Sequence, residues 1–539
     1  MVAAGCPAED GGGTGGETSA AETSAADTSG ATNVTATGAV DSTGDGSSGG
    51  TGDGLVPASG LHIDWVEANQ GVGIPIGQDG AWVGPGDRIA RLLQGRVTLI
   101  RAFWQLDADW EPREIQAHLV LEWPDGTVDR RIDSKMIEDD AFIGDLGRVF
   151  FWGIEAELAV PGLTYSIELY EADGTPTEGA PTAPNFFPSV EGTPQLIGIE
   201  DSYQLIKAVI VPFNYNEPGG GCTTQPDTSD STMQLFEDLL YMQNPVDATE
   251  IVLHEPIEWN EQLTAFGQLN TFLSELRFDE GALPETYYYG LVDVCAGGLG
   301  DAGGQALGIP TNPTSMDAAY QRVSSGLSLQ PDWSAETFVH EVGHSQGRMH
   351  VDCGGAAGWD PTYPFDGGDV GEWGFGVIDF QLRHPTVNKD YMTYCHPTWV
   401  GTWGWNKVQP VIETLSTWDA NYPGNGNVAP EDPYGGSLLL GVVLENGDET
   451  WITVPGGLTG YEVLGDAEVE YDFGNGVTVR TPAVMQLLPD TDDLKIVAPL
   501  PDRFEDVHAI TRVVGGRRQL VERGAVREHH HQRLIHRRR

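Results

Sequence analysis

Residues 338–350, FVHEVGHSQGRMH, decide how this chain is interpreted, because they contain H-E-x-x-H within the longer pattern H-E-x-x-H-x-x-G-x-x-H. Residues four apart on a helix lie on one face, with Cβ atoms ~5–6 Å apart. His340 and His344 can therefore offer ring nitrogens to one Zn²⁺ at ~2.0–2.1 Å. Gly347 can adopt a positive φ and end the helix, so the chain can turn back and present His350 as a third ligand.

Glu341 follows the first histidine of the pattern. Three neutral histidines and a water leave the fourth position open, as a catalytic zinc site requires. Glu341 lies beside the ligands and is placed to act on the zinc-bound water rather than to bind the metal. Two alternatives are a pair of core histidines on a buried helix and a copy of the site that binds metal without activity. The intact Glu341 argues against the second alternative.

The extended pattern resembles the zinc signature of the metzincin metalloendopeptidases. In that family a methionine downstream lies beneath the zinc ligands in the Met-turn. Met392, which lies 42 residues after His350 in DYMTYC, matches this methionine. Tyr394 matches the tyrosine that the astacin and serralysin branches use near the metal. Alone, Met392 is equally well a core-filling side chain, but the spacing and the tyrosine favour the resemblance.

The resemblance implies a fold and a reaction. It covers residues 205–418 and implies an α+β catalytic domain with a mixed sheet and an active-site helix. The implied activity is that of a secreted bacterial zinc endopeptidase, in which Glu341 is the general base on zinc-bound water and Tyr394 helps to hold the oxyanion. Family members bind extended substrate along an edge strand before the active-site helix. Residues 326–330 are either that strand or an ordinary loop.

The cysteines apart from the one near the N-terminus are Cys222, Cys295, Cys353 and Cys395. Four cysteines allow three pairings. The third follows His350 by three residues and the fourth follows Met392 by three. If both loops meet at the metal, as the resemblance implies, a bridge between these two cysteines would join them and leave the first two to pair. The even number favours an oxidising compartment, and the lack of a C-x-x-C pair argues against a thiolate metal site.

The chain on either side of this domain is predicted to be β-rich. Residues 165–170, YSIELY, alternate polar and apolar side chains as a half-buried strand does. Short strands separated by Gly, Pro and Asp favour a β-sandwich before the catalytic domain. The expected organisation is an acidic disordered tether at 1–54, a β-sandwich-like domain at 55–200, a metzincin catalytic domain at 203–420, a small β-domain at 433–500 and a basic disordered tail at 511–539.

The two ends of the chain have a biased composition. Residues 1–54 contain no Lys, Arg or aromatic residue and cannot bury enough apolar area to offset their ordering entropy. Residues 2–6, VAAGC, resemble a bacterial lipobox with Cys6 as the lipidation candidate, yet no basic and apolar leader precedes them. Either the natural start lies upstream, or Cys6 is a terminal thiol. Residues 511–539 carry nine Arg and two Glu, a local charge of 9 − 2 = +7; a metal-binding or nucleic-acid-binding patch is the alternative to a disordered tail.

The formal net charge of −52 argues against binding to nucleic acid and against electrostatic docking on anionic lipid. No apolar run reaches the ~18 residues of a membrane span. We therefore expect a secreted protein or a cell-surface lipoprotein of a bacterial outer membrane, whose partner is a protein or glycoprotein substrate.

Two further predictions concern a second cation and a different function. Residues 366–369, DGGD, can bind a structural Ca²⁺, although acidic Gly-rich loops usually only turn. The alternative function is a surface-anchored adhesion or glycan-binding lipoprotein with an inert zinc domain. Glu341 argues against this alternative, while cleavage preference and natural substrate do not follow from the sequence.

Overall fold

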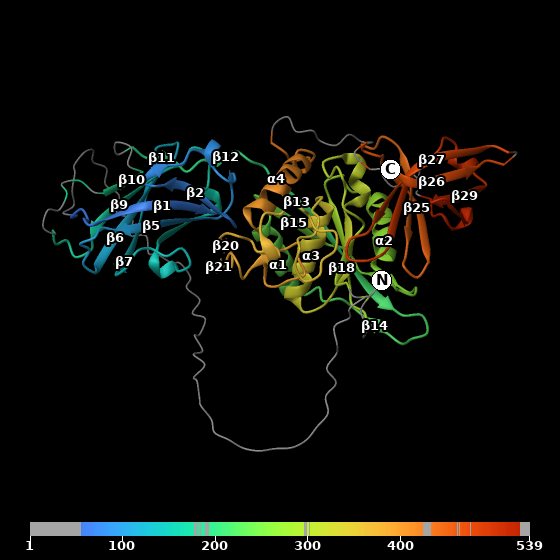
Figure 1. Cartoon of the computed structure of the whole chain (residues 1–539), viewed down its shortest axis with the longest axis horizontal. Helices are drawn as coiled ribbons and strands as arrows, with labels where there is room; N and C mark the ends of the chain where they lie inside the picture. Colours follow the sequence, from blue (N-terminus) through green and yellow to red (C-terminus); the bar gives the residue numbers. More distant parts are fainter. Residues whose placement is uncertain are drawn as a thin grey trace, which may run out of the picture. The chain divides into compact units, whose positions relative to one another are not determined.

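The computed structural model describes residues 55–528, except for residues 177–180, 182, 184, 189–192, 296–298, 301, 424–432, 461, 463 and 475. This part of the chain is a multidomain, β-rich protein with few helices (Figure 1). None of its described helices combines the length and apolarity needed to cross a bilayer. The predicted tether at 1–54 and the lipidation candidate Cys6 lie outside the described residues.

The N-terminal domain contains two antiparallel sheets that share one hydrophobic core (Figure 1). Their strand orders are β3-β2-β1-β5-β8 and β10-β9-β6-β7, with β11 paired to β9. In β9, Tyr165, Ile167 and Leu169 are fully buried, so the period-2 pattern of this segment places alternate side chains in the core. The strands are β1 Leu61–Asn69, β2 Gly73–Gln78, β3 Ala81–Trp82, β4 Leu92–Leu93, β5 Thr98–Leu106, β6 Arg113–Glu122, β7 Val128–Ile137, β8 Phe150–Ile154, β9 Thr164–Glu171, β10 Asn185–Phe187, β11 Gln195–Leu196 and β12 Ile199–Glu200.

The central domain is built on a mixed sheet of order β14-β13-β17-β19-β18, with β15 and β16 also paired to β13. Strands β13, β15, β16, β17 and β19 run parallel, whereas β14 and β18 are antiparallel to their neighbours. Its longer strands are β13 Leu205–Asn216, β15 Ala248–Leu253, β17 Tyr287–Val292 and β19 Val323–Leu327, and its shorter ones are β14 Thr223–Thr224, β16 Ile257–Trp259 and β18 Gly304–Ala306. Two separate strand pairs follow in the chain, β20 Gly374–Gly376 with β21 Gln381–Arg383, and β22 Lys389–Asp390 with β23 Thr398–Trp399.

Helices cover both faces of this sheet. They are α1 Asp230–Gln243, α2 Phe266–Asp279, α3 Pro331–Ser345 and α4 Thr402–Ser416. On one face, Phe338 of α3 stacks on Phe236 of α1 at 5.0 Å and meets Tyr289 of β17 edge-on at 5.0 Å. On the other face, Phe213 of β13 packs against Phe272 of α2 at 5.8 Å. The sheet therefore forms the middle layer, and α3, which carries the histidine pattern, is fixed to it by aromatic packing.

The edge strand next to α3 is not residues 326–330, the segment that the sequence analysis considered for this role. Residues 323–327 form β19, which pairs with β17 on one side and with β18 on the other. Residues 326–330 are therefore not the edge strand, because their first two residues lie inside the sheet and the rest follow it. The edge is β18, a short antiparallel strand whose sequence lacks the alternation that would identify a strand.

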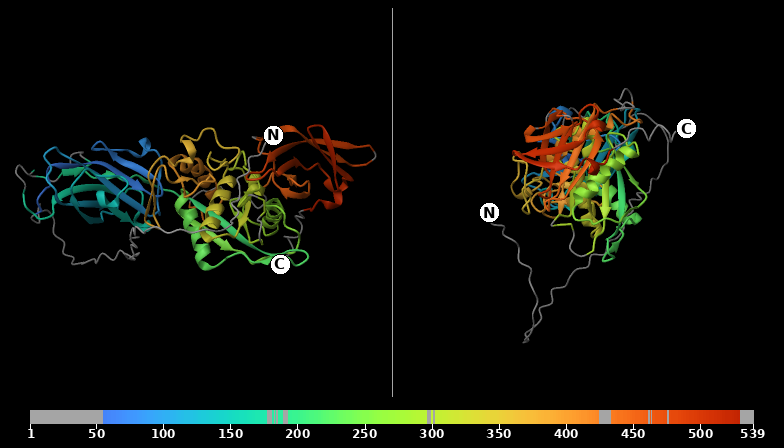
Figure 2. Two further views of the ribbon diagram at one scale, coloured as in Figure 1. Left: turned by 60° about the horizontal axis from the view of Figure 1, so that its bottom comes forward. Right: turned by 90° about the vertical axis from the view of Figure 1, so that its right-hand side faces the viewer.

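The C-terminal domain is one antiparallel sheet of order β25-β24-β28-β27-β26-β29-β30, drawn in orange and red (Figure 2). Its strands are β24 Ser437–Val443, β25 Glu449–Pro455, β26 Leu464–Asp472, β27 Thr478–Leu487, β28 Leu494–Pro499, β29 Ala509–Val514 and β30 Arg517–Val521. Leu440 and Val442 of β24 share a hydrophobic core with Phe266 and Leu269 of α2. The sheet thus packs directly on the central domain.

The prediction of a disordered tail from 511 is wrong for residues 511–528. Strands β29 and β30 complete the C-terminal sheet, and Ile510, Val521 and Val526 are buried. Two of the basic residues form ion pairs: Arg512 pairs with Glu449 at 2.7 Å, and Arg518, which stays exposed, pairs with Glu470. Basic residues that suggest a solvated tail therefore lie on strands of this sheet and pair with its acidic side chains. Residues 529–539 lie outside the described part.

Candidate metal centre

Helix α3 positions the first two predicted ligands. Pro331 occupies its first turn, where a missing N–H costs nothing. The helix ends at Ser345, and Gly347 follows with φ +89°, while the Arg348 N–H donates to the Gly343 carbonyl at 2.9 Å. This C-terminal turn is the one that the glycine predicts. It redirects the chain so that His350 returns to the face of the helix that carries His340 and His344.

The three histidines converge on one point. His344 Nε2 lies 3.1 Å from His340 Nε2 and 3.1 Å from His350 Nε2. Their exposed fractions are 8% for His340, 0% for His344 and 3% for His350. Two nitrogens bound tetrahedrally at ~2.0–2.1 Å to one ion lie roughly 3.3 Å apart, so the observed spacing is that of a shared metal ligand set.

The other nitrogen of each ring fixes the tautomer. His340 Nδ1 donates to the Tyr391 carbonyl, His344 Nδ1 to the Arg348 carbonyl and His350 Nδ1 to the Ala357 carbonyl, each at 2.7 Å. Because Nδ1 carries the hydrogen, each Nε2 presents a lone pair. Three lone pairs facing one another in a buried site repel unless a cation lies between them, so these residues fit a bound metal ion.

Burial also controls the protonation of the ligands. It lowers the pKa of His340 to about 3, and it lowers the pKa of His344. Burial acts in the same direction on His350, but the Asp490 carboxylate stabilises the protonated form of this ring, in which Nε2 also carries a hydrogen, and so raises its pKa. Neutral imidazole is the form that binds a metal, so His340 and His344 need lose no proton near pH 7.

Glu341 lies against the edge strand beside the ligands. It is 2% exposed, and a Cβ at Gly304 of β18 would approach its Oε1 to 2.8 Å. The Ala306 backbone N–H hydrogen-bonds to this carboxylate, yet Oε2 is buried without a hydrogen-bond partner among the described residues. Burial, and then the negative charge of Asp490, raise the pKa of Glu341 well above its ordinary value. An unpartnered buried carboxylate oxygen next to the ligands is suited to take a proton from a bound water.

Met392 lies under the ligand helix. It is fully buried, and a Cβ at Gly343 would approach its sulfur to 2.6 Å. Its carbonyl accepts from the Val351 N–H at 2.9 Å, which ties this turn to the segment carrying His350. The Asp390 carboxylate accepts from the Met392 N–H at 2.9 Å and pairs with buried Arg348 at 2.9 Å. The turn at 390–392 thus holds the ligand loops from below.

Tyr394 reaches the same centre, and the disulfides agree with the prediction. The Tyr394 hydroxyl lies 3.3 Å from His350 Nε2 and donates to Asp490 Oδ1 at 2.6 Å. A disulfide joins Cys353 to Cys395 and so connects the loop after His350 to the Met392 turn. A second disulfide joins Cys222 to Cys295. The pairing predicted from the two loops is confirmed, and both bridges are compatible with an extracellular protein.

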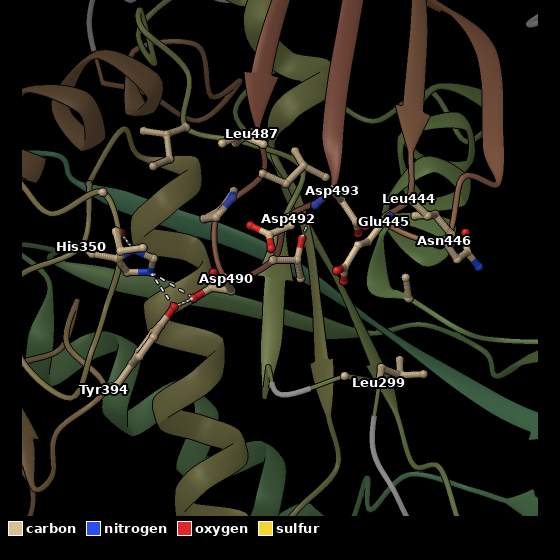
Figure 3. A pocket seen from close by; sticks show the side chains of 18 of the residues that line it. Leu299, His350, Tyr394, Leu444, Glu445, Asn446, Leu487, Asp490, Asp492 and Asp493 are labelled. Carbon is tan, nitrogen blue, oxygen red and sulfur yellow. Dashed lines mark hydrogen bonds and ion pairs between the residues drawn. The ribbon is translucent and has the colours of Figure 1, made fainter. Parts of the chain in front are cut away.

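A fourth residue, Asp490, joins the three histidines, and the sequence analysis did not single it out. Asp490 lies in the turn after β27, and its carboxylate oxygens lie 3.0 Å from His350 Nε2, 3.5 Å from His344 Nε2 and 3.8 Å from His340 Nε2. Figure 3 shows His350 and Tyr394 directed at this carboxylate. His340, His344, His350 and Asp490 form a buried group that could hold a metal ion. The surrounding sequence, LPDTDD at 488–493, predicts an acidic turn and carries no pattern that would indicate a metal ligand.

The centre opens into a cleft of about 520 Å³. The residues that line it include His340, Glu341, Tyr394, Asp490, Gly304 of β18 and Trp333 of α3. The loop at 366–369, predicted as a candidate calcium site, does not form a comparable cluster of ligands among the described residues. Among the described residues, the 366–369 segment does not gather three ligand side chains, and its Asp369 carboxylate is paired with Lys389.

Comparisons with known proteins do not identify the chain. No protein-family model matches it, and no curated protein matches it. Among solved structures, a calcium-binding mutant of Bacteroides uniformis beta-glucuronidase 2 matches with a TM-score of 0.16 and 10% sequence identity. This match covers 44% of the present chain and 29% of that chain. So weak a likeness says nothing about the fold or the activity.

Proposed function

We propose that this protein is a zinc-dependent endopeptidase of the metzincin type, which hydrolyses peptide bonds of extracellular proteins. His340, His344 and His350 hold the metal and Glu341 is the general base. The observation that carries the proposal is the convergence of three Nε2 lone pairs, with that of His344 3.1 Å from each of the other two, beside the unpartnered Oε2 of Glu341. This combination serves hydrolysis better than it serves a purely structural role.

Zinc is the metal that this ligand set favours. Imidazole suits zinc among several transition metals, and three histidines are a ligand set of catalytic zinc sites. A bound zinc ion would supply Lewis-acid polarisation of the scissile carbonyl and would lower the pKa of water to about 7.

The chain's own residues would carry the proton transfers. Glu341 accepts a proton from the attacking water and passes it to the leaving amine. Burial raises the pKa of Glu341 above its ordinary value, and a more basic carboxylate holds the transferred proton more firmly until the amine leaves. The Tyr394 hydroxyl lies next to the ligands and can donate a hydrogen bond to the oxyanion. An extended substrate can add to the sheet along β18, which borders the cleft.

One observation favours a second candidate function. With Asp490 the ligand group has four members, and structural zinc sites are closed by four protein ligands. In that case the central domain would be an inert zinc-stabilised scaffold, and the β-rich domains of a surface adhesion or glycan-binding protein would act. Glu341 has no task in this alternative.

The full-length chain and its Glu341→Gln variant test the proposal. We expect about one zinc per chain in both, and casein cleavage that falls roughly 10²–10⁴-fold in the variant, the usual contribution of general acid–base catalysis. The matched control is Asp332→Asn, an exposed carboxylate on the first turn of the same helix, which should leave cleavage unchanged. Equal cleavage by Glu341→Gln, or no bound zinc in either protein, would reject the proposal.

A further inference from the structure

Asp490 comes from a different domain than the residues it meets. It lies between β27 and β28 of the C-terminal sheet, whereas the three histidines belong to the central domain. We infer that Asp490 is an intramolecular inhibitory ligand, which closes the fourth position of the metal centre until the turn at 488–493 withdraws. This inference rests on the proposed endopeptidase function.

The Asp490 carboxylate occupies the position at the metal that a substrate or water would need. Hydrolysis requires a fourth metal position that is open to water or substrate. One Asp490 oxygen lies 3.0 Å from His350 Nε2 and the other lies 3.5 Å from His344 Nε2. The Asp490 side chain is 7% exposed, and its Oδ2 has no hydrogen-bond partner in the described protein. A buried carboxylate beside three nitrogen lone pairs is suited to bind the same cation, because Tyr394 donates a hydrogen bond to Oδ1 only and Oδ2 faces no donor among the described residues.

The same carboxylate engages the group proposed to hold the oxyanion. The Tyr394 hydroxyl donates to Asp490 Oδ1 at 2.6 Å, as the dashed lines in Figure 3 indicate. While this hydrogen bond lasts, the hydroxyl proton is not available to a substrate. Asp490 therefore blocks the metal position and the oxyanion donor together.

The rest of the turn is docked on the edge strand. Gln305 of β18 donates from Nε2 to Thr491 Oγ at 2.6 Å. Next to the turn, Gln486 Nε2 donates to the Ile309 carbonyl at 3.0 Å. These contacts place the β27–β28 turn beside the strand along which an extended substrate would bind. A substrate and this turn therefore compete for the same surface.

The backbone of the turn makes the inference testable with mild substitutions. Asp490 has φ +68°, a left-handed conformation that is unfavourable for most side chains but is tolerated by Asn and is free of strain for Gly. Asp490→Gly removes the carboxylate and suits this backbone. Asp490→Asn keeps the size and removes the charge. Neither substitution removes an apolar side chain from the core, so both variants are expected to fold.

The first measurement is hydrogen exchange of the 488–493 amides in full-length protein, with and without one equivalent of zinc. Zinc should slow this exchange at least 10-fold in the wild type and should leave it unchanged in Asp490→Gly. Zinc affinity, measured by competition with a chelating dye, should fall at least 10-fold in Asp490→Gly and less in Asp490→Asn. The control is Asp492→Asn, an exposed carboxylate of the same turn (Figure 3), which should behave as wild type. Zinc-independent exchange with unchanged affinity would overturn the inference.

The second measurement is casein cleavage by the same proteins at saturating zinc. Asp490→Gly should cleave at least 10-fold faster than wild type, and the double variant with Glu341→Gln should be inactive. If wild type and Asp490→Gly cleave equally, or if Asp490→Gly cleaves more slowly, the inhibitory role is wrong while the endopeptidase stands. If zinc protects the turn only in the wild type but neither protein cleaves, the endopeptidase proposal fails, and with it the inhibitory role.

Discussion

Asp490 Oδ1 lies 3.0 Å from His350 Nε2, although 140 positions separate the two residues in the chain. The first lies in the turn between β27 and β28 of the C-terminal sheet, and the second lies in the loop after α3. Their contact makes the metal centre a joint product of two domains. Any change that loosens the C-terminal sheet is therefore expected to alter the centre, even when it touches none of the histidines.

Metal removal should lower the thermal stability of this protein. Only the folded chain brings the Nε2 atoms of His340 and His350 to 3.1 Å from that of His344, so a metal binds the native state preferentially. A metal at 1,000 times its Kd stabilises by about 4 kcal/mol. For a protein of this size we expect a chelator to lower the Tm by about 5 °C or more.

The matched variants are His350→Ala and His508→Ala, measured by thermal unfolding with and without chelator. His350→Ala should abolish the chelator effect because it removes a ligand. His508 is exposed on the C-terminal domain, so its variant should keep the effect. A wild-type Tm that does not respond to chelator would contradict the assignment of these residues as a metal site.

The contact between Gly343 and Met392 should be sensitive to a single methyl group. A Cβ at Gly343 would lie 2.6 Å from the Met392 sulfur and 2.9 Å from the Tyr391 ring. We expect Gly343→Ala to destabilise the fold by about 1–3 kcal/mol, as overpacking does, even though alanine is the better helix former by about 1 kcal/mol. Zinc affinity should also fall, because the Tyr391 carbonyl orients His340.

Urea unfolding and dye competition for zinc check this prediction. The control is Gly153→Ala, at a strand glycine with no heavy atom within 4 Å of the added Cβ. The packing argument fails if Gly343→Ala is as stable as wild type and binds zinc equally well.

Lys495 should make stability depend on pH above neutrality. It is 2% exposed in β28 and donates to Gln321, and burial lowers the pKa of its ammonium group to about 7. The unfolded chain keeps the ordinary value of 10.5. Between pH 7 and 10.5 the unfolded state therefore binds more protons than the native state. Consequently the contribution of Lys495 to the free energy of unfolding becomes more favourable as pH rises.

We expect wild type to gain about 1 kcal/mol per pH unit relative to Lys495→Met between pH 7.5 and 9.5. Urea denaturation at three pH values measures this difference. Lys407→Met, at an exposed lysine of α4, is the control and should run parallel to wild type. Parallel curves for wild type and Lys495→Met would show that the buried amine does not titrate in this range.

Much of the centre could be predicted because its determinants are local. The spacing of His340 and His344 is set by the helical period, and Gly347 ends the helix with the positive φ that its position requires. The Met392 segment, once placed beneath the helix by resemblance, also predicts the Cys353–Cys395 bridge. The period-2 pattern of 165–170 identifies a strand because one face of the sheet is buried.

Other features were decided by partners far away in the chain. The basic residues of 511–528 suggest a solvated tail, but Arg512 pairs with Glu449 of β25 and Arg518 with Glu470 of β26. The edge of the central sheet is β18 rather than 326–330, because strand order depends on which segments pair and not on any one segment's composition.

The sequence alone therefore determined the identity of the three histidines, the glutamate beside them and the helix that presents them, because helix geometry converts short spacings directly into positions in space. Only the tertiary structure decided that Asp490 completes the group. A turn in the C-terminal sheet reaches the histidines through the packing of β24 on α2 and of β27 on the central domain. No local periodicity encodes a contact that arises from the docking of one domain on another.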